Sequence, residues 1–419
     1  MSSAFSNALS GLIANNQAIN IISTNLANMD TSGYKEQQVS FQELVNESAS
    51  GTSTTGGVSG SVIAQSLQQF NQGTLETTGN PYDAAIQGGG FFVVDTPEGQ
   101  QLYTRQGNFD VDSTGHLVTA NGEYVQGWNA VNGTLTTSGP SGDIVLPTNL
   151  VLQPSATTQF TVSANLNANA TVGSASATFS SPITVYDAQG VQHTLTVTYT
   201  ETAANTWTYA VTIPSADLTG GTGTNTQLTT GTLTFNGSGQ LLTPAASAGP
   251  IPIAITGLAD GATDLNLNWN LYNTSGNPTL TQFEQASANT ASSQDGVGAG
   301  QLTNLSIGSN GFIVAEFSNG SSENVAQIAL ASVLNPDSMQ QVDGNSFAAT
   351  GQTAVPVIGT PGTGARGAVT GGSLETSTVD IATEFTNLLQ YERGYQANSK
   401  VITTEDEIVQ QTISLIANG

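Results

Sequence analysis

The residue patterns closest to a metal-binding or phosphate-binding loop occur in two short segments of the chain. Asp110 and Asp112 have the spacing at which a calcium-binding loop begins, but Asn121 stands at the twelfth position, which must supply a bidentate carboxylate. The run Gly88–Gly90 has the composition of a phosphate-binding loop but lacks the lysine that follows in such loops. We interpret the first segment as a turn between strands and the second as the start of the strand at Phe91.

Catalysis by histidine is limited to His116 and His193, each of which follows a turn. The members of a Ser-His-Asp triad need not be neighbours in sequence, but no G-x-S-x-G nucleophile elbow accompanies either histidine. The 30 carboxylates permit an acid–base pair without indicating one. The chain has no cysteine, which excludes disulfides and thiolate metal sites. We therefore expect no catalytic site, no metal site and no cofactor.

The charge balance excludes two classes of partner. The five cations are Lys35, Arg105, Arg366, Arg393 and Lys400, and the net charge is −25. Nucleic acids and anionic membranes are bound through clustered cations, so we expect neither partner. No run of about 18 apolar residues is present, so we expect no membrane insertion. The N-terminal segment lacks the pattern of a cleavable signal peptide, and an exported chain would leave the cell by another route.

Both ends of the sequence are predicted to form long helices with an apolar stripe. At each end, apolar residues recur every seven positions, as in a coiled coil. An amphipathic helix lying on a globular core is the alternative, but matching stripes at the two ends favour pairing of the two helices. The residues expected to form this self-association seam are Phe5, Leu12, Ile19, Leu26, Ile381, Phe385, Leu388, Tyr395, Ile402, Val409 and Ile416.

Both predicted helices contain poor helix formers. Gly11 and Gly394 each destabilise a helix by about 1 kcal/mol relative to alanine, and Asn15 interrupts the seam. Helices without tertiary cover are marginal in water. We infer that the two ends fray in the single chain and fold when neighbouring subunits cover their stripes.

Between the helices the apolar period changes from seven to two. In residues 194–200 and 206–213 apolar residues alternate with polar ones, chiefly threonine, and in residues 265–271 they alternate with asparagine. This alternation predicts a hairpin and further strands, each with one apolar face. The predicted fold is therefore mixed, with a terminal α-helical coiled coil of the paired N- and C-terminal helices and nested all-β domains.

Pairing of the chain ends implies that the domains are nested. We expect four parts: an axial coiled-coil domain, a linker or hinge region, an inner β domain and an outer inserted β domain. Their ranges are 1–34 with 374–419, 35–75 with 365–373, 76–149 with 292–364, and 150–291. The glycine-rich segments 51–60 and 360–372 are the expected hinges.

Three segments carry a specific combination of motifs, within residues 1–130 and 325–419. The motif positions are Asn25, Ala27, Asn28, Gly33, Tyr34, Lys35, Asp83, Gly90, Phe91, Phe92, Arg105, Gly107, Arg393, Gly394, Tyr395, Ala397 and Asn398. This combination resembles the flagellar rod and hook proteins. The resemblance implies a non-enzymatic subunit of an extracellular helical tube, exported by the flagellar type III apparatus.

The resemblance also implies partners: further copies of the chain, the distal rod protein, the hook cap and the hook–filament junction proteins. The segment from about residue 150 to 292 is absent from distal rod members, which favours the hook members of the family. A distal rod protein is the first alternative. An unrelated surface β-protein, such as an adhesin or a polysaccharide-active enzyme, is the second.

Overall fold

The computed structural model describes residues 3–44, 61–131 and 133–417 of the chain. They form two compact units built from segments that are distant in sequence. Unit 1 comprises residues 1–148, 305–315 and 323–419, and unit 2 comprises residues 149–304 and 316–322. The chain therefore passes between the units at four points. None of the helices in the described ranges is long and apolar enough to span a membrane.

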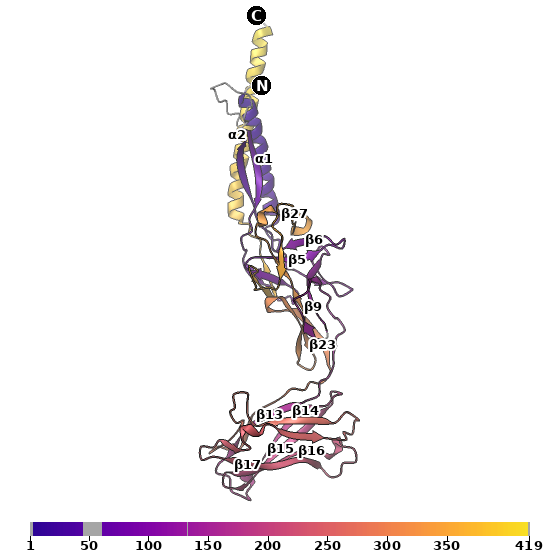
Figure 1. Cartoon of the computed structure of the whole chain (residues 1–419). Coiled ribbons are helices and arrows are strands. Elements are labelled where there is room, and N and C mark those ends of the chain that lie inside the picture. The colour runs from indigo at the N-terminus through magenta and orange to yellow at the C-terminus, as the bar shows by residue number, and fades with distance from the viewer. Residues whose placement is uncertain (1–2, 45–60, 132, 418–419) are drawn as a thin grey trace. The chain divides into compact units, whose positions relative to one another are not determined.

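Two long helices stand at the ends of the described chain, as predicted. Helix α1 (Ser3–Ala27) and helix α2 (Ile381–Ala417) lie side by side in unit 1 (Figure 1). Gly11 lies opposite Asn398 and Asn25 opposite Glu384, so the helices are antiparallel. Both are helical in the single chain, whereas the sequence predicts fraying. Each helix supplies part of the cover that the other needs.

A strand pair packs beside the helices where the sequence predicts a linker. Strands β1 (Gln37–Leu44) and β2 (Ser61–Gln68) are antiparallel, β2 packs on α1, and the Phe41 ring lies 5.6 Å from the Tyr391 ring of α2. Val39 and Phe41 alternate with polar residues, and this strand pattern was obscured by the glycine-rich segment that follows. That segment, residues 51–60, lies outside the described residues.

The β body of unit 1 is one branched sheet with a small aromatic core. Its main order is β25–β9–β5–β6–β28–β27; β10, β11 and β8 pair with β9, β7 pairs with β8, and β26 pairs with β5 and β29. The strands are β5 (Phe91–Asp95), β6 (Gln101–Thr104), β7 (Asp110–Val111), β8 (Leu117–Val118), β9 (Tyr124–Val131), β10 (Thr134–Leu135), β11 (Gly142–Asp143), β25 (Ser322–Ile328), β26 (Leu330–Ser332), β27 (Gln340–Val342), β28 (Ser346–Ala348) and β29 (Val357–Gly359). Strands β23 (Gly300–Ile307) and β24 (Phe312–Phe317) cross the division between the units, and β12 (Val151–Leu152) pairs with β23 inside unit 2.

Two short strand pairs join early and late parts of the chain. Strand β3 (Leu75–Thr77) pairs with β31 (Ser373–Glu375), and β4 (Ala84–Gln87) pairs with β30 (Ala368–Gly371). The segment 360–372 is therefore not a free hinge. A Cβ atom on Gly371 would overlap the carbonyl oxygen of Ile307, and one on Gly367 would overlap that of Gln87. The glycines here permit close approach of backbones instead of flexibility.

The two segments considered above as ligand sites are a turn between strands and the entry to a strand. Asp112 Oδ1 accepts hydrogen bonds of 2.8 Å from the backbone amides of Thr114 and His116, between β7 and β8. Gly88 and Gly90 have φ angles of 105° and 108° and lead into β5. The interpretation of the first segment as a turn between strands, and of the second as the start of the strand at Phe91, is confirmed.

Unit 2 is a sandwich of two sheets. One sheet has the order β19–β20–β13–β21 with β22 beside β13, and the other has the order β14–β15–β16–β17–β18. The strands are β13 (Gln159–Asn167), β14 (Thr178–Tyr186), β15 (Gln192–Ala203), β16 (Thr206–Pro214), β17 (Asn225–Phe235), β18 (Leu241–Thr243), β19 (Ile251–Ile255), β20 (Leu265–Asn270), β21 (Leu280–Phe283) and β22 (Ala288–Gln294). The predicted hairpin is β15–β16.

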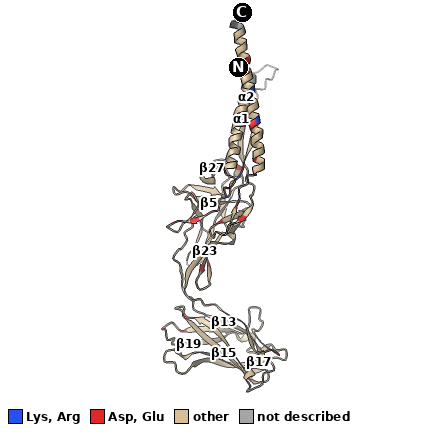
Figure 2. Cartoon of the chain, turned by 180° about the vertical axis from the view of Figure 1, so that it is seen from behind, with Lys and Arg blue, Asp and Glu red and all other residues tan. Residues whose placement is uncertain are grey.

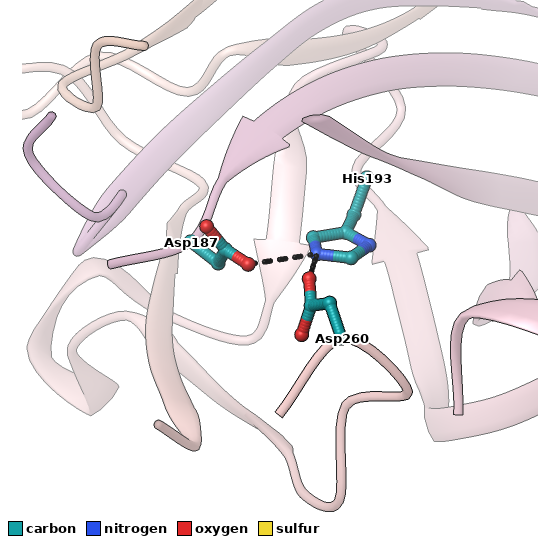
Figure 3. Close-up of side chains that lie close together, drawn as sticks. All are labelled: Asp187, His193 and Asp260. Atoms are coloured by element: carbon teal, nitrogen blue, oxygen red, sulfur yellow. Dashed lines mark hydrogen bonds and ion pairs between the residues drawn. The ribbon is translucent and has the colours of Figure 1, made fainter. Parts of the chain in front are cut away.

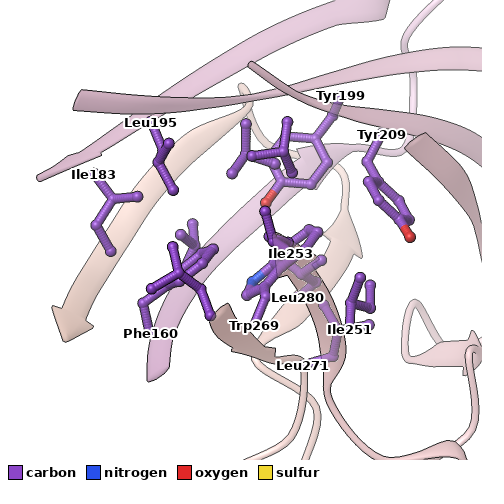
Figure 4. Close-up of a cluster of buried hydrophobic side chains, with 14 of the residues drawn as sticks. Phe160, Ile183, Leu195, Tyr199, Tyr209, Ile251, Ile253, Trp269, Leu271 and Leu280 are labelled. Carbon is purple, nitrogen blue, oxygen red and sulfur yellow. The ribbon is translucent and has the colours of Figure 1, made fainter. Parts of the chain in front are cut away.

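The predicted apolar faces of unit 2 meet in its core (Figure 4). The ring of Trp269 on β20 lies 5.2 Å from that of Tyr209 on β16 and 6.3 Å from that of Tyr199 on β15. The threonines of β15 and β16 lie on the opposite, partly exposed face. Unit 2 contains no lysine or arginine, since none lies between Arg105 and Arg366 (Figure 2).

Candidate functional site

The contact between α1 and α2 is built around two glycines and two asparagines. A Cβ atom on Gly11 would lie 2.8 Å from Asn398 Nδ2, and one on Gly394 would lie 2.6 Å from Asn15 Oδ1. Asn15 Nδ2 donates to the Gly11 carbonyl at 2.6 Å, and Asn398 Nδ2 donates to the Gly394 carbonyl at 3.0 Å. The same Gly-x-x-x-Asn pattern thus works reciprocally on the two helices. The residues that weaken each isolated helix are those that let the pair approach closely.

The predicted seam lies beside this contact. The buried side chains of α1 are mostly small ones: Ala8, Ala14, Ala18, Ile22 and Asn25. The predicted seam residues of α1 are only half-buried, as are three of those on α2: Phe5, Leu12, Ile19, Leu26, Leu388, Tyr395 and Ile402.

The other predicted residues of α2 are more open to solvent. Ile381, Phe385 and Val409 remain 46%, 53% and 49% exposed, and the side chain of Ile416 lies outside the described part. We call Ile381, Phe385, Leu388, Tyr395, Ile402 and Val409 the α2 stripe. It is a long apolar surface that the described part of the chain covers only in part.

A buried ionic cluster joins the start and the end of the chain to the β body. Glu375 Oε1 lies 2.6 Å from Lys35 Nζ, and Glu375 Oε2 lies 3.1 Å from Arg105 Nη1. Glu375 Oε1 also accepts a hydrogen bond of 2.7 Å from the Gly73 amide. Burial lowers the pKa of Lys35 and of Arg105, and the Glu375 carboxylate opposes both shifts. Two of the five cations therefore share one buried carboxylate. We call these three residues the Glu375 cluster.

A second buried network ties the base of α1 to α2. Asn25 Oδ1 accepts from Tyr34 Oη at 3.1 Å and from the Gln37 amide at 3.0 Å. Asn25 Nδ2 donates to the Gln37 carbonyl at 2.8 Å and to Glu384 Oε1 at 2.9 Å. Asn25 is fully buried, and both its amide oxygen and its amide nitrogen have partners.

Among the residues that the structure describes, the second oxygen of Glu384, Oε2, is buried without a hydrogen-bond partner. Burial raises the pKa of Glu384 to about 7; the carboxylates of Glu36 and Asp380 add to the shift and the hydrogen bond from Asn25 opposes it. Burial, followed by Glu384 and Glu36, raises the pKa of Tyr34 to about 12. The base of the helix pair therefore holds a carboxyl group that stays protonated at higher pH than an ordinary glutamate.

Most other motif positions lie between the base of the helices and the β body of unit 1. Gly33 donates its amide to the Glu375 carbonyl at 2.7 Å, and Gly107 leaves room for the Ala84 carbonyl. Asp83 is buried beside β4, Phe91 and Phe92 are buried in β5 after Gly90, and Ala27 and Asn28 end α1. Arg393 and Ala397 are exposed on α2. No roles for Glu375 and Glu384 were predicted from the sequence. The available signal was that Lys35 and Arg105, two of only five cations, are both motif positions, which indicates that they pair with specific carboxylates.

Four family models match successive parts of the chain. They are described as flagella basal body rod protein at residues 5–35, flagellar hook protein FlgE/F/G D1 domain at 85–170, flagellar basal body protein FlaE D2 domain at 155–297, and flagellar basal body rod FlgEFG protein C-terminal at 370–415.

Curated relatives match over nearly their full length. The flagellar hook protein FlgE of Rhizobium meliloti is 32% identical, covering 97% of both chains. That of Treponema pallidum is 31% identical over 99% of both, and that of Salmonella typhimurium is 32% identical over 98% of this chain and all of the relative. The motifs at both ends and the central β insertion thus occur together in one family. The chain belongs to the family of flagellar hook proteins FlgE.

Proposed function

We propose that the chain is the structural subunit of the bacterial flagellar hook, which polymerises into a flexible curved tube and transmits motor torque from rod to filament. The full-length similarity to hook proteins carries this proposal. The central segment 150–291 lies within the matched region, which favours a hook subunit over a distal rod protein. We infer that the chain is exported through the flagellar type III apparatus and meets the distal rod, hook cap and hook–filament junction proteins outside the cell.

We further propose that the helices of neighbouring subunits pair as a coiled coil in the innermost layer of the tube. The α2 stripe supports this step, because its apolar side chains are still exposed in the single chain. Full burial of a large apolar side chain contributes about 1.5–3 kcal/mol, so a few such contacts between subunits are enough to drive assembly. The division into axial, inner and outer domains is part of the same proposal.

The threonine faces of unit 2 suit contacts that must change as the tube rotates while bent. Small uncharged side chains can exchange partners at little energetic cost, whereas ion pairs would favour one register. Unit 2 contains no lysine or arginine with which to form such pairs.

Electron microscopy of the polymer assembled from the purified chain tests the function. Uniform curved tubes are expected, and straight rods would favour the distal rod alternative. Chains lacking residues 1–30 or 380–419 should remain monomeric while keeping a β-rich circular dichroism spectrum. Tubes formed by either truncated chain would show that the helices are not the assembly device.

A further inference from the structure

Three aspartates surround one buried histidine in unit 2. His193, only 4% exposed, lies at the start of β15. Its Nδ1 atom is 3.1 Å from Asp217 Oδ2, and its Nε2 atom is 3.5 Å from both Asp187 Oδ2 and Asp260 Oδ2 (Figure 3). The aspartates come from the turn after β14, the short helix after β16 and the turn after β19, so only the folded sandwich brings them to one imidazole.

The two ring nitrogens of His193 face different carboxylates, and the contacts of Nε2 with Asp187 and Asp260, at 3.5 Å, are longer than the 3.1 Å contact of Nδ1 with Asp217. In the tautomer that donates from Nδ1 to Asp217 Oδ2, the Nε2 atom carries a lone pair. This lone pair faces the Oδ2 atoms of Asp187 and Asp260, which are acceptors as well. In that tautomer three acceptor atoms converge at one point, beside the buried Asp187 and the exposed Asp260, and a cation bound there would pair with all three. Unit 2 has no lysine or arginine to provide one.

The two aspartates already hold their Oδ2 atoms toward this point. Asp187 Oδ1 accepts hydrogen bonds of 2.8 Å from the amides of Gln189 and Val191. Asp260 Oδ1 accepts one of 2.9 Å from the Ala262 amide. In both residues the backbone occupies one carboxylate oxygen and leaves the other for a ligand.

The spacing of the three atoms fits a small divalent ion. His193 Nε2 and the Oδ2 atoms of Asp187 and Asp260 lie within 4.8 Å of one another. Tetrahedral bonds of about 2.0–2.1 Å place neighbouring ligand atoms about 3.3–3.4 Å apart, close to the two nitrogen–oxygen distances of 3.5 Å. A histidine ligand whose other nitrogen donates to a carboxylate is the usual arrangement around such ions.

We propose that His193, Asp187 and Asp260 bind one divalent transition-metal ion of the zinc type, and that Asp217 orients the imidazole. The three ligands leave a fourth position for water. The ion links the β14–β15 turn to the turn after β19 and so stabilises unit 2. The sequence predicts no metal site, because the ligands are spread over residues 187–260 and only the fold assembles them.

The test is titration of the chelator-treated, full-length monomer with zinc chloride by calorimetry, with thermal unfolding followed by tryptophan fluorescence. We expect one saturable site and, in a Trp128→Phe background that leaves only Trp207 and Trp269 of unit 2, a higher unfolding temperature. His193→Gln should abolish both effects. His116→Gln is the matched control, because His116 also lies near an aspartate, 3.7 Å from Asp112, but in unit 1.

Two further variants keep the test decisive if His193→Gln fails to fold. Asp260→Asn retains an oxygen for the Ala262 amide and should weaken zinc binding at least tenfold. Asp217→Asn retains all three ligands and should weaken it about tenfold through the orientation of the imidazole. Equal zinc affinity in the wild type and Asp260→Asn would overturn the proposal. So would a wild-type unit 2 whose stability ignores zinc and falls as pH rises, because the cation would then be the proton of an imidazolium.

Discussion

Replacing Glu375 by glutamine is expected to destabilise unit 1 strongly. The Glu375 side chain is 0% exposed and accepts from three donors, namely Lys35 Nζ, Arg105 Nη1 and the Gly73 amide. Glutamine retains one acceptor oxygen, but its amide group would face a cation. Lys35 and Arg105 would then be buried without a counter-ion. Their mutual repulsion and their lost hydration would raise the free energy of the folded state, whereas water solvates both in the unfolded state.

The expected loss is about 3–5 kcal/mol, the usual effect of removing one partner from a buried ion pair. A domain of this kind has a total free energy of unfolding of about 5–15 kcal/mol, so the variant should lose a large part of its stability. Glu76→Gln is the matched control, since Glu76 is exposed on β3, the strand that pairs with the strand of Glu375. Its expected effect is within about 0.5 kcal/mol.

Urea unfolding measured with two signals separates the units. Circular dichroism at the helical minimum follows α1 and α2, both in unit 1. In a Trp128→Phe background the fluorescence reports unit 2 alone, because Trp207 and Trp269 are the other tryptophans of the chain. Glu375→Gln should lower the helical midpoint and leave the fluorescence midpoint unchanged. A loss below about 1 kcal/mol, or an equal loss in Glu76→Gln, would refute the structural role of the Glu375 cluster.

Three further predictions concern assembly, pH and the inserted unit. Leu388→Asp or Ile402→Asp should block the polymerisation seen by electron microscopy, because a carboxylate would be buried between subunits. Thr196→Asp should not block it, and equal effects would mean that the axial helical layer and the outer β domain are assigned wrongly. Because the pKa of Glu384 is raised from 4.5 to about 7, its contribution to stability is complete below about pH 4.5 and is lost as pH rises to about 7. Glu384→Gln should abolish this loss of about 1–2 kcal/mol in urea unfolding, and identical pH profiles would contradict the assignment. Replacing residues 150–291 by a short Gly/Ser linker should leave polymers that are straight in micrographs; curved tubes would exclude a role in curvature, and absence of tubes would make the insertion necessary for assembly.

The terminal helices and the long strands of unit 2 were predictable because their patterns are long. Heptad spacing marks α1 and α2, and alternation marks β15, β16 and β20 over several residues each. The helix contact was not predictable in the same way. Counting large apolar residues selects Leu12 and Ile19, whereas a close antiparallel contact selects Gly11 and Ala18, which allow the backbones to approach.

The β body and the polar sites of unit 1 were harder to predict. Several of its strands have only two to four residues, too few to show a period. Glu375 meets Lys35 across 340 residues of sequence, and Asn25 meets Glu384 across 359. No short sequence pattern marks residues that are partners at such separations. Only the scarcity of lysine and arginine indicates that a buried cation pairs with a specific carboxylate.

The four chain passages between the two units have a mechanical consequence. A single covalent linker swivels about its own bonds, so it carries tension but no twist. Four passages cannot all turn about one axis without winding around each other. Torque on one unit is therefore transmitted to the other through the covalent chain. This transmission does not depend on which non-covalent contacts form or break during each revolution. A single proteolytic cut at one passage would leave the units joined by the remaining three.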